Sequence, residues 1–220
     1  MFHVEHSWVA HLSLSQEQWE LLRRYEELLR FWNRRLNLLS RRDEDRIWER
    51  HLLHSLVIAR RKFGVGDWVL DVGTGGGLPG IPLAIAFPEV RFVLVDAVAK
   101  KVAAVRAMVY RLGLENVEVR HGRVERLRER FTHAVSRAVA PLGQLWRWVG
   151  PLLRDAPAPC PDRWEGGLIV LKGDDWVREV GGLSGVRVRA ESIMEFWPVT
   201  EMEGKFLLHL SPRPACVSGE

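Results

Sequence analysis

One stretch constrains this chain more than any other. Residues 69–80 are an apolar run that ends in an acid and then breaks into five glycines within eight residues. The run predicts a buried strand, and the glycines predict a loop at its carboxyl end because glycine reaches positive φ without strain. Pro79 and Pro82 suit the first turn of a following helix, where a missing N–H costs nothing. Such a loop lets backbone approach a ligand at a helix N-terminus, so the stretch predicts a nucleotide-type cofactor site.

The acids near this loop indicate which cofactor it favours. The Gly-x-Gly-x-x-Gly spacing that begins at Gly75 also fits a dinucleotide site, but Asp71 stands where dinucleotide sites usually carry an apolar residue. A second predicted strand, residues 91–96, ends in Asp96, which is placed to bind both hydroxyls of a ribose. An acid at each strand end resembles the S-adenosylmethionine site of class I methyltransferases, in which the first acid serves the cationic amino-acid end. Dinucleotide chemistry and a glycine turn without a ligand are the alternatives.

Size and composition narrow the class of protein. A chain of 220 residues predicts one large domain, or a domain with an appendage, that buries a sizeable core. No apolar run approaches the roughly 20 residues of a membrane span, and the N-terminus lacks the pattern of an export signal. The two cysteines, Cys160 and Cys216, lie in proline-flanked loops, which fits a reducing compartment. We therefore expect a cytoplasmic protein that has no membrane partner.

Arginine is clustered more than the overall charge suggests. The formal net charge is only +4, from 32 Lys+Arg against 28 Asp+Glu. One arginine cluster lies in the N-terminal quarter and a second over residues 120–130. Solvated helix faces are one interpretation. The other is a phosphate-binding surface, because arginine forks match phosphate oxygens and a basic face attracts a polyanion, which favours a nucleic-acid substrate. In that interpretation the RNA-binding candidates of the first cluster are Arg34, Arg35, Arg41 and Arg42.

The N-terminal quarter predicts two helices. Residues 15–39 have apolar positions spaced by three and four and open with a Ser-x-x-Gln capping box, which is typical of an amphipathic helix. A second helix is predicted over residues 44–61. We expect these helices to form a cap, residues 1–63, packed on a cofactor domain over residues 64–220.

From residue 67 the pattern alternates strands with helices, which predicts right-handed parallel β-α-β units. The predicted strands lie near residues 68–72, 91–96, 116–120, 133–138, 167–172, 186–194 and 205–211. The predicted helices lie near residues 79–87, 98–112, 141–153 and 174–181. Only a short turn joins the last two strands, so they should pair as an antiparallel hairpin. The expected fold is α/β and Rossmann-like, with a seven-stranded, mostly parallel sheet that ends in this hairpin, as in class I methyltransferases.

Several separate segments resemble one family. They are residues 32–38, 51–56, 71–82, 100–101, 136–142 and 171–173. On these segments the chain is similar to the bacterial 16S ribosomal RNA guanine-N7 methyltransferases, the glucose-inhibited division protein B family. The combination of Gly-Leu-Pro-Gly-Ile-Pro with Ser-Arg-Ala is far more specific than the glycine loop alone.

The resemblance implies methyl transfer from S-adenosyl-L-methionine to N7 of a guanine in 16S ribosomal RNA. The substrate would be naked RNA or the small ribosomal subunit, and we expect the protein to be a monomer. The glycine loop and the resemblance together predict the cofactor-binding residues. They are Asp71, Gly73, Gly75, Leu78, Asp96, Val124, Glu125 and Arg137. A solvated acid is the alternative for Glu125, and a structural salt bridge for Arg137. Phosphate contacts are further predicted, with solvated charge as the alternative, at Lys100, Lys101, Arg123 and Lys172.

Two positions depart from the family pattern. His54 stands in place of an aspartate, and Leu39-Ser40 follows Asn37-Leu38 where the family has Asn-Leu-Thr. These departures leave open a divergent paralogue that acts on another RNA or binds RNA without catalysis. A nicotinamide-dependent oxidoreductase is a further alternative.

The predicted reaction requires little from the protein's side chains. Guanine N7 carries a free lone pair and loses no proton, so positioning and electrostatics would supply the catalysis. No residue is therefore assigned a catalytic role, and Arg137 is the best candidate contributor. His51 and His54 lack further ligands, so we expect no metal. Cys160 lies in a late loop rather than after the fourth strand, which disfavours it as a nucleophile.

Overall fold

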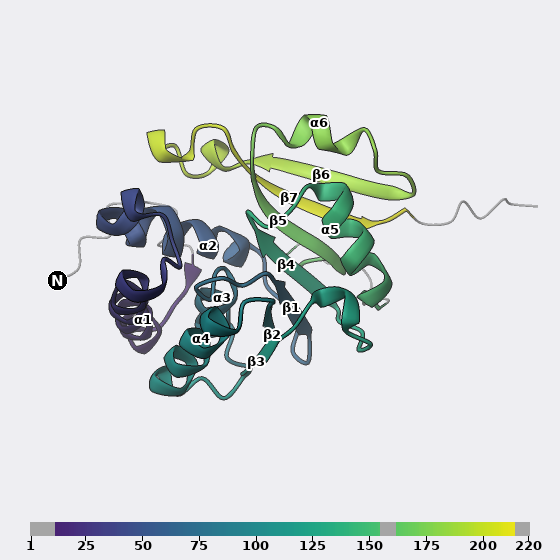
Figure 1. Ribbon diagram of the computed structural model, residues 1–220. Helices are drawn as coiled ribbons and strands as arrows, with labels where there is room; N and C mark the ends of the chain where they lie inside the picture. The colour runs from purple at the N-terminus through teal and green to yellow at the C-terminus, as the bar shows by residue number, and fades with distance from the viewer. Residues whose placement is uncertain (1–11, 155–161, 214–220) are drawn as a thin grey trace, which may run out of the picture.

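A seven-stranded sheet runs through the molecule in the order β3-β2-β1-β4-β5-β7-β6 (Figure 1). The computed structural model describes residues 12–154 and 162–213. Strands β1 to β5 pair in parallel, whereas β7 lies between β5 and β6 and is antiparallel to both. The predicted sheet and its terminal hairpin are confirmed. The strands are β1 Trp68–Val72, β2 Arg91–Asp96, β3 Val117–His121, β4 His133–Arg137, β5 Gly167–Gly173, β6 Val186–Ser192 and β7 Lys205–Pro212.

Helices cover both faces of the sheet, so its central strands are apolar on both sides. In β1 the neighbouring residues Val69 and Leu70 point to opposite faces, and both are fully buried. Val69 belongs to the hydrophobic cluster under the N-terminal helices, α3 and α4, and Leu70 to the cluster under α5. The predicted helices are confirmed with shorter bounds: α3 Gly80–Ala86, α4 Ala99–Leu112, α5 Leu142–Val149 with a 3-10 turn at Gly150–Leu152, and α6 Trp176–Val180.

The first N-terminal helix, α1, spans Gln16–Leu36. Its predicted capping box is present: Ser15 Oγ accepts the N–H of Gln18 at 3.2 Å, and Gln18 Oε1 accepts the N–H of Ser15 at 2.8 Å. The helix ends at Asn37, whose φ of 48° lies in the left-handed region. Of the predicted apolar stripe, Leu22, Tyr25 and Leu29 are buried, and Trp32 and Leu36 are half-buried against the same cluster. The amide of Asn33 is buried beside them.

The second predicted helix is helical but not regular. Instead of one α-helix over residues 44–61, short 3-10 and π turns alternate with α2, His54–Leu56. All side chains from 51 to 58 are buried, because this segment lies between α1 and the sheet and has no solvent-facing side. A wide π turn at Trp48–Leu53 therefore turns His51, Leu52 and Leu53 inward together.

The N-terminal helices pack directly on the glycine loop. The Tyr25 hydroxyl donates to the Gly76 carbonyl at 2.9 Å, and a Cβ added to Gly76 would lie 2.9 Å from Leu29 Cδ1. Residues on both sides of position 64 thus share one hydrophobic cluster. The division into residues 1–63 and 64–220 stays a prediction. Within the described residues, no helix is long and apolar enough to cross a membrane.

Candidate functional site

Asp71, the acid at the end of β1, lies beneath the glycine loop. It is fully buried, and its Oδ2 accepts hydrogen bonds from the Thr74 hydroxyl at 2.6 Å and the Gly80 N–H at 2.9 Å. Its Oδ1 is buried and has no hydrogen-bond partner among the described residues. Burial raises the pKa of Asp71 to about 7. The carboxyl therefore stabilises the loop through Oδ2, while Oδ1 forms no hydrogen bond among the described residues.

Asp96, at the end of β2, holds the other side of the same loop. Its Oδ2 accepts the Gly75 N–H at 2.9 Å and its Oδ1 accepts the Val98 N–H at 2.8 Å. Gly75 has a φ of +58°, and the nearest atom to a Cβ added there is the Gly73 carbonyl oxygen at 3.9 Å. Space beside Gly75 is thus open, so a ligand can approach its backbone closely.

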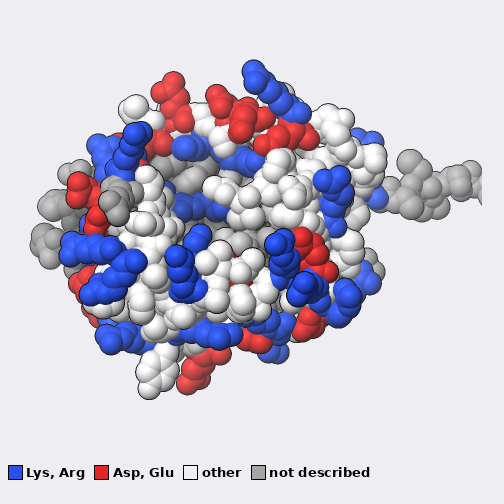
Figure 2. Space-filling view, in the orientation of Figure 1, with Lys and Arg blue, Asp and Glu red and all other residues white. Residues whose placement is uncertain are grey.

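A cavity of about 680 Å³ opens at the carboxyl ends of β1, β4 and β5, under the N-terminal helices (Figure 2). Of the predicted site residues, the cavity is lined by Gly73, Gly75, Leu78, Lys101, Arg137 and Lys172. Asp71, Asp96, buried Val124 and exposed Glu125 are not among its lining residues. The structure therefore brings the loop glycines, Leu78 and Arg137 to one cavity and leaves both strand-end acids and the adenine candidates outside its lining.

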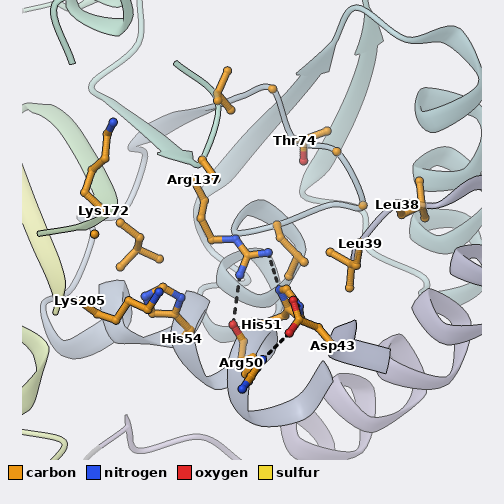
Figure 3. Close-up of a pocket in the computed structure, with 18 of the residues that line it drawn as sticks. Leu38, Leu39, Asp43, Arg50, His51, His54, Thr74, Arg137, Lys172 and Lys205 are labelled. Atoms are coloured by element: carbon orange, nitrogen blue, oxygen red, sulfur yellow. Dashed lines mark hydrogen bonds and ion pairs between the residues drawn. The ribbon is translucent and has the colours of Figure 1, made fainter. Parts of the chain in front are cut away.

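Sequence reasoning missed several groups that line this cavity. They are Leu38, Leu39, Asp43, Arg50, His51, His54 and Lys205 (Figure 3). His51 and His54 lie inside a segment that matched the family, so that match was the available signal. Nothing local marks Lys205, which begins β7 and reaches the site only through the antiparallel pairing of the last strands.

Arg137, at the end of β4, projects into the cavity and is held by the N-terminal segment (Figure 3). Its Nη2 donates to His51 Nδ1 at 2.7 Å, and its Nη1 donates to the Arg50 carbonyl at 3.3 Å. Burial lowers the pKa of Arg137 from its high ordinary value. A structural salt bridge was the alternative role predicted for Arg137. Among the described residues, Arg137 has no salt-bridge partner.

Both cavity histidines are neutral. Because Arg137 can only donate, His51 Nδ1 accepts, and the ring proton lies on Nε2, 3.4 Å from Asp43 Oδ2. Burial and the charge of Arg137 lower the pKa of His51 to about 4. Burial, with Arg137 and Lys205 nearby, holds the pKa of His54 well below its usual value. Its buried Nε2 has no hydrogen-bond partner among the described residues.

Positive charge dominates the cavity wall. Lys172 Nζ is held by Glu179 at 2.7 and 2.8 Å, and Arg50 Nη1 by Asp43 Oδ1 at 2.6 Å. Lys101 and Lys205 have no acidic partner in the described parts of the chain. The cavity therefore suits a ligand that carries negative charge.

The other predicted phosphate contacts lie away from the cavity. Arg34 Nε pairs with Glu44 at 3.1 Å, and the Arg35 guanidinium lies 3.6 Å from the centre of the Phe31 ring. Both line a separate surface hollow on α1. The exposed candidates are Arg42, Lys100 and Arg123, and the side chain of Arg41 is outside the described residues.

The arrangement fits a nucleoside with a cationic amino-acid end. The Oδ1 of Asp71, which has no partner in the described chain, suits an ammonium group, and the open side of the glycine loop suits backbone contact with a ligand.

The described residues contain no group of three or more His, Cys, Asp or Glu side chains that could hold a metal ion. Cys160 and Cys216 lie outside the described residues.

Comparison with known proteins extends this assignment beyond the fold. A family profile described as rRNA small subunit methyltransferase G matches residues 18–175. Two relatives named ribosomal RNA small subunit methyltransferase G match most of the chain. The protein from Salinibacter ruber is 45% identical over 177 residues, which cover 80% of this chain and 82% of the relative. The protein from Chlorobaculum tepidum is 48% identical over 162 residues, which cover 73% and 70%.

Among solved structures, an rRNA methylase from Streptococcus thermophilus has a similar fold. Its TM-score is 0.50 at 16% identity, over 74% of this chain and 95% of that one. The family profile spans the segment from α1 to the end of β5, which includes the glycine loop, Arg137 and the segment that holds it. The chain therefore belongs to the rRNA small subunit methyltransferase G family.

Proposed function

We propose that this protein transfers the methyl group of S-adenosyl-L-methionine to N7 of a guanine in 16S ribosomal RNA. The observation that carries the proposal is the cavity in which the open side of Gly75 and the guanidinium of Arg137 line the same wall. Family membership supports a methyl donor and a ribosomal RNA substrate. The positive wall supports a polyanionic substrate.

The donor would be held from the glycine loop. Asp71 Oδ1 would bind the ammonium group, and the backbone at Gly73 and Gly75 would lie against the methionine end. Asp96 would bind the ribose hydroxyls, because each carboxylate oxygen that accepts an N–H keeps a further lone pair. Val124 and Glu125 would line the adenine. When bound, the donor supplies an electrophilic methyl group on a sulfonium.

The reaction itself requires no proton acceptor. The N7 lone pair forms the new carbon–nitrogen bond while the electron pair of the breaking carbon–sulfur bond returns to sulfur. The protein therefore has to orient the base, hold its N7 in line with the breaking carbon–sulfur bond, and exclude water. Neutral His51 and His54 are consistent with this reaction, since neither has to act as a base.

The RNA would enter as a locally opened strand. A guanine inside a helix cannot reach a cavity under the N-terminal helices, so it would leave its stack, with Lys101 and Lys205 beside the neighbouring phosphates. Naked 16S RNA or the small subunit is the proposed partner. We further propose that the protein is monomeric, acts in the cytoplasm and uses no metal.

Transfer of a tritiated methyl group tests the proposal. The protein is incubated with labelled S-adenosylmethionine and, in separate reactions, with small subunits, naked 16S RNA and large-subunit RNA. Label in either small-subunit substrate and none in the last supports the proposal. Binding of donor and RNA without transfer would instead indicate an RNA-binding protein. Thermal stabilisation by NAD and none by S-adenosylmethionine would indicate an oxidoreductase.

A further inference from the structure

Three polar side chains from two parts of the fold contact one another along the cavity wall. Asp43 Oδ2 faces His51 Nε2 at 3.4 Å, and His51 Nδ1 accepts from Arg137 Nη2 at 2.7 Å (Figure 3). Asp43 and His51 come from the irregular segment before the sheet, whereas Arg137 ends β4. The proposed reaction uses no base, so it gives no role to a neutral histidine in this place.

The hydrogen bond from Arg137 defines both the tautomer and the orientation of His51. A guanidinium never accepts, so His51 Nδ1 must carry a lone pair toward Arg137. The proton on Nε2 then lies on the side of Asp43, 3.4 Å from its Oδ2, a contact too loose to count as a hydrogen bond, while Asp43 Oδ1 is bound by Arg50 at 2.6 Å. An inverted ring would face Arg137 with an N–H and would not form the 2.7 Å bond.

Arg137 gains a fixed position from these interactions. One N–H of Nη2 goes to His51 and one of Nη1 to the Arg50 carbonyl. The remaining N–H groups have no hydrogen-bond partner among the described residues, so a ligand in the cavity can accept from them. A guanidinium that is fixed before the ligand binds loses less conformational freedom on binding, and it holds its charge at one place in the site.

We propose that Asp43 and His51 are positioning residues that orient Arg137 toward the bound donor and target base. The inference rests on the proposed function, since it assumes that Arg137 contacts the reacting molecules. Asp43 acts through His51, and His51 acts through Arg137. A segment that precedes the cofactor-binding strands would in this way complete their active site.

Three substitutions of one residue separate the relay from simple packing. In His51→Asn the amide oxygen lies near the place of Nδ1 and can still accept from Arg137. His51→Gln places its amide nearer to Nε2, toward Asp43, and His51→Ala can form neither the hydrogen bond to Arg137 nor the contact with Asp43. We expect single-turnover transfer to fall by about tenfold or more in His51→Ala and His51→Gln, and by about threefold or less in His51→Asn. Asp43→Asn should likewise retain more activity than Asp43→Ala.

Double substitution tests whether His51 acts through Arg137. In an Arg137→Ala background, His51→Ala should cause no further loss of transfer, because the group it positions is gone. Glu26→Ala is the matched control: it removes a partly buried ion pair of α1, Glu26 with Arg30 at 2.9 Å, that does not touch Arg137. This control should leave transfer unchanged. The melting temperature of each variant is measured alongside.

Three results are decisive. If all three His51 variants lose transfer in proportion to their melting temperatures, the role is structural and the inference is wrong. Equal losses from His51→Ala with and without Arg137 would also overturn it. If Arg137→Ala itself changes neither donor affinity nor transfer, the proposed function of this site fails first, and the relay fails with it.

Discussion

The carboxylate of Asp96 accepts the backbone N–H of Gly75 at 2.9 Å, so the acid at the end of β2 holds the loop that follows β1. Neighbouring parallel strands bring their carboxyl ends to one edge, which is where ligands of open α/β sheets bind. The hydrogen bond leaves the side of Gly75 that faces the cavity open.

A side chain at Gly75 should therefore block the donor rather than unfold the protein. We expect Gly75→Val to abolish donor binding, measured by isothermal titration calorimetry, because the branched side chain would fill the space where backbone meets ligand. A valine held at the positive φ of position 75 also adds about 1–2 kcal/mol of backbone strain. Gly113→Val is the matched control: Gly113 has a φ of +69° and nothing within 4 Å of its Cβ position. Equal donor affinity in the two variants would contradict this placement of the donor.

Donor affinity should rise with pH through neutrality. Burial raises the pKa of Asp71 from 3.8 to about 7, so the free protein carries an uncharged Asp71 below that pH. The donor's ammonium group favours the ionised form, and affinity should rise by up to about tenfold per pH unit below pH 7 and then level off. Asp71→Asn should bind weakly with no such slope. A parent protein whose donor affinity is independent of pH would refute the role of Asp71.

The same shift in pKa has a consequence for stability. Because the pKa of Asp71 is higher in the folded than in the unfolded protein, ionisation of this group opposes folding. Its contribution is fully favourable below pH 3.8 and is lost as pH rises to about 7. Donor binding should offset this loss, so the donor should raise the melting temperature more at pH 8 than at pH 6. These pH values are about one unit on either side of the folded pKa.

The sequence predicted those parts of the fold that depend on local chemistry. Glycines at positive φ, prolines in a first helical turn and the Ser15–Gln18 capping box each act over a few residues, so the loop and the helix starts were predictable. Alternating apolar runs predicted all seven strands, and the short final turn predicted the hairpin. The irregular winding around residues 51–58 was not predictable, because it follows from burial on all sides by elements distant in sequence.

The site was predicted only in part for the same reason. Gly75 was predicted from the glycine loop, and Arg137 from the family resemblance and its place at a strand end. The partners of Arg137 come from a segment more than 80 residues earlier, which periodicity does not locate. Lys172 was predicted to contact phosphate, yet Glu179 holds its ammonium group, a pairing that only the folded structure shows. The cofactor roles of all the predicted residues stay predictions, and Asp71, Asp96, Val124 and Glu125 do not line the cavity.

Removal of the unpaired cavity lysines should reduce RNA binding and its dependence on salt. For each phosphate that Lys101→Ala or Lys205→Ala leaves unneutralised, the slope of log affinity against log salt should fall by about 0.7–0.9. Arg120→Ala is the control, because Arg120 is bound by Glu118 and Glu129 on the surface. Arg34 and Arg35 already have partners, so their joint replacement should change the slope less. An unchanged slope in both lysine variants would mean that these lysines are solvated and do not contact RNA phosphates.

The rate of transfer at saturating donor should be nearly independent of pH. Guanine N7 has no proton to lose, and both cavity histidines are neutral because their pKa values lie well below the usual one. Single-turnover rates should be flat from about pH 6.5 to about pH 9, and Cys160→Ala should retain full activity. His54→Ala should change the rate modestly, through positioning. A rate that rises about tenfold per pH unit in the parent, but not in His54→Ala, would reveal a base and a target atom that carries a proton.

The identity of the methylated nucleoside tests the central claim most directly. Small subunits or 16S RNA that lack the modification are treated with the protein and S-adenosylmethionine, digested to nucleosides and analysed by mass spectrometry against standards. The proposed function predicts 7-methylguanosine as the product, absent when Gly75→Val replaces the parent protein. A different methylated nucleoside, such as one methylated on an exocyclic amine or on carbon, would contradict it.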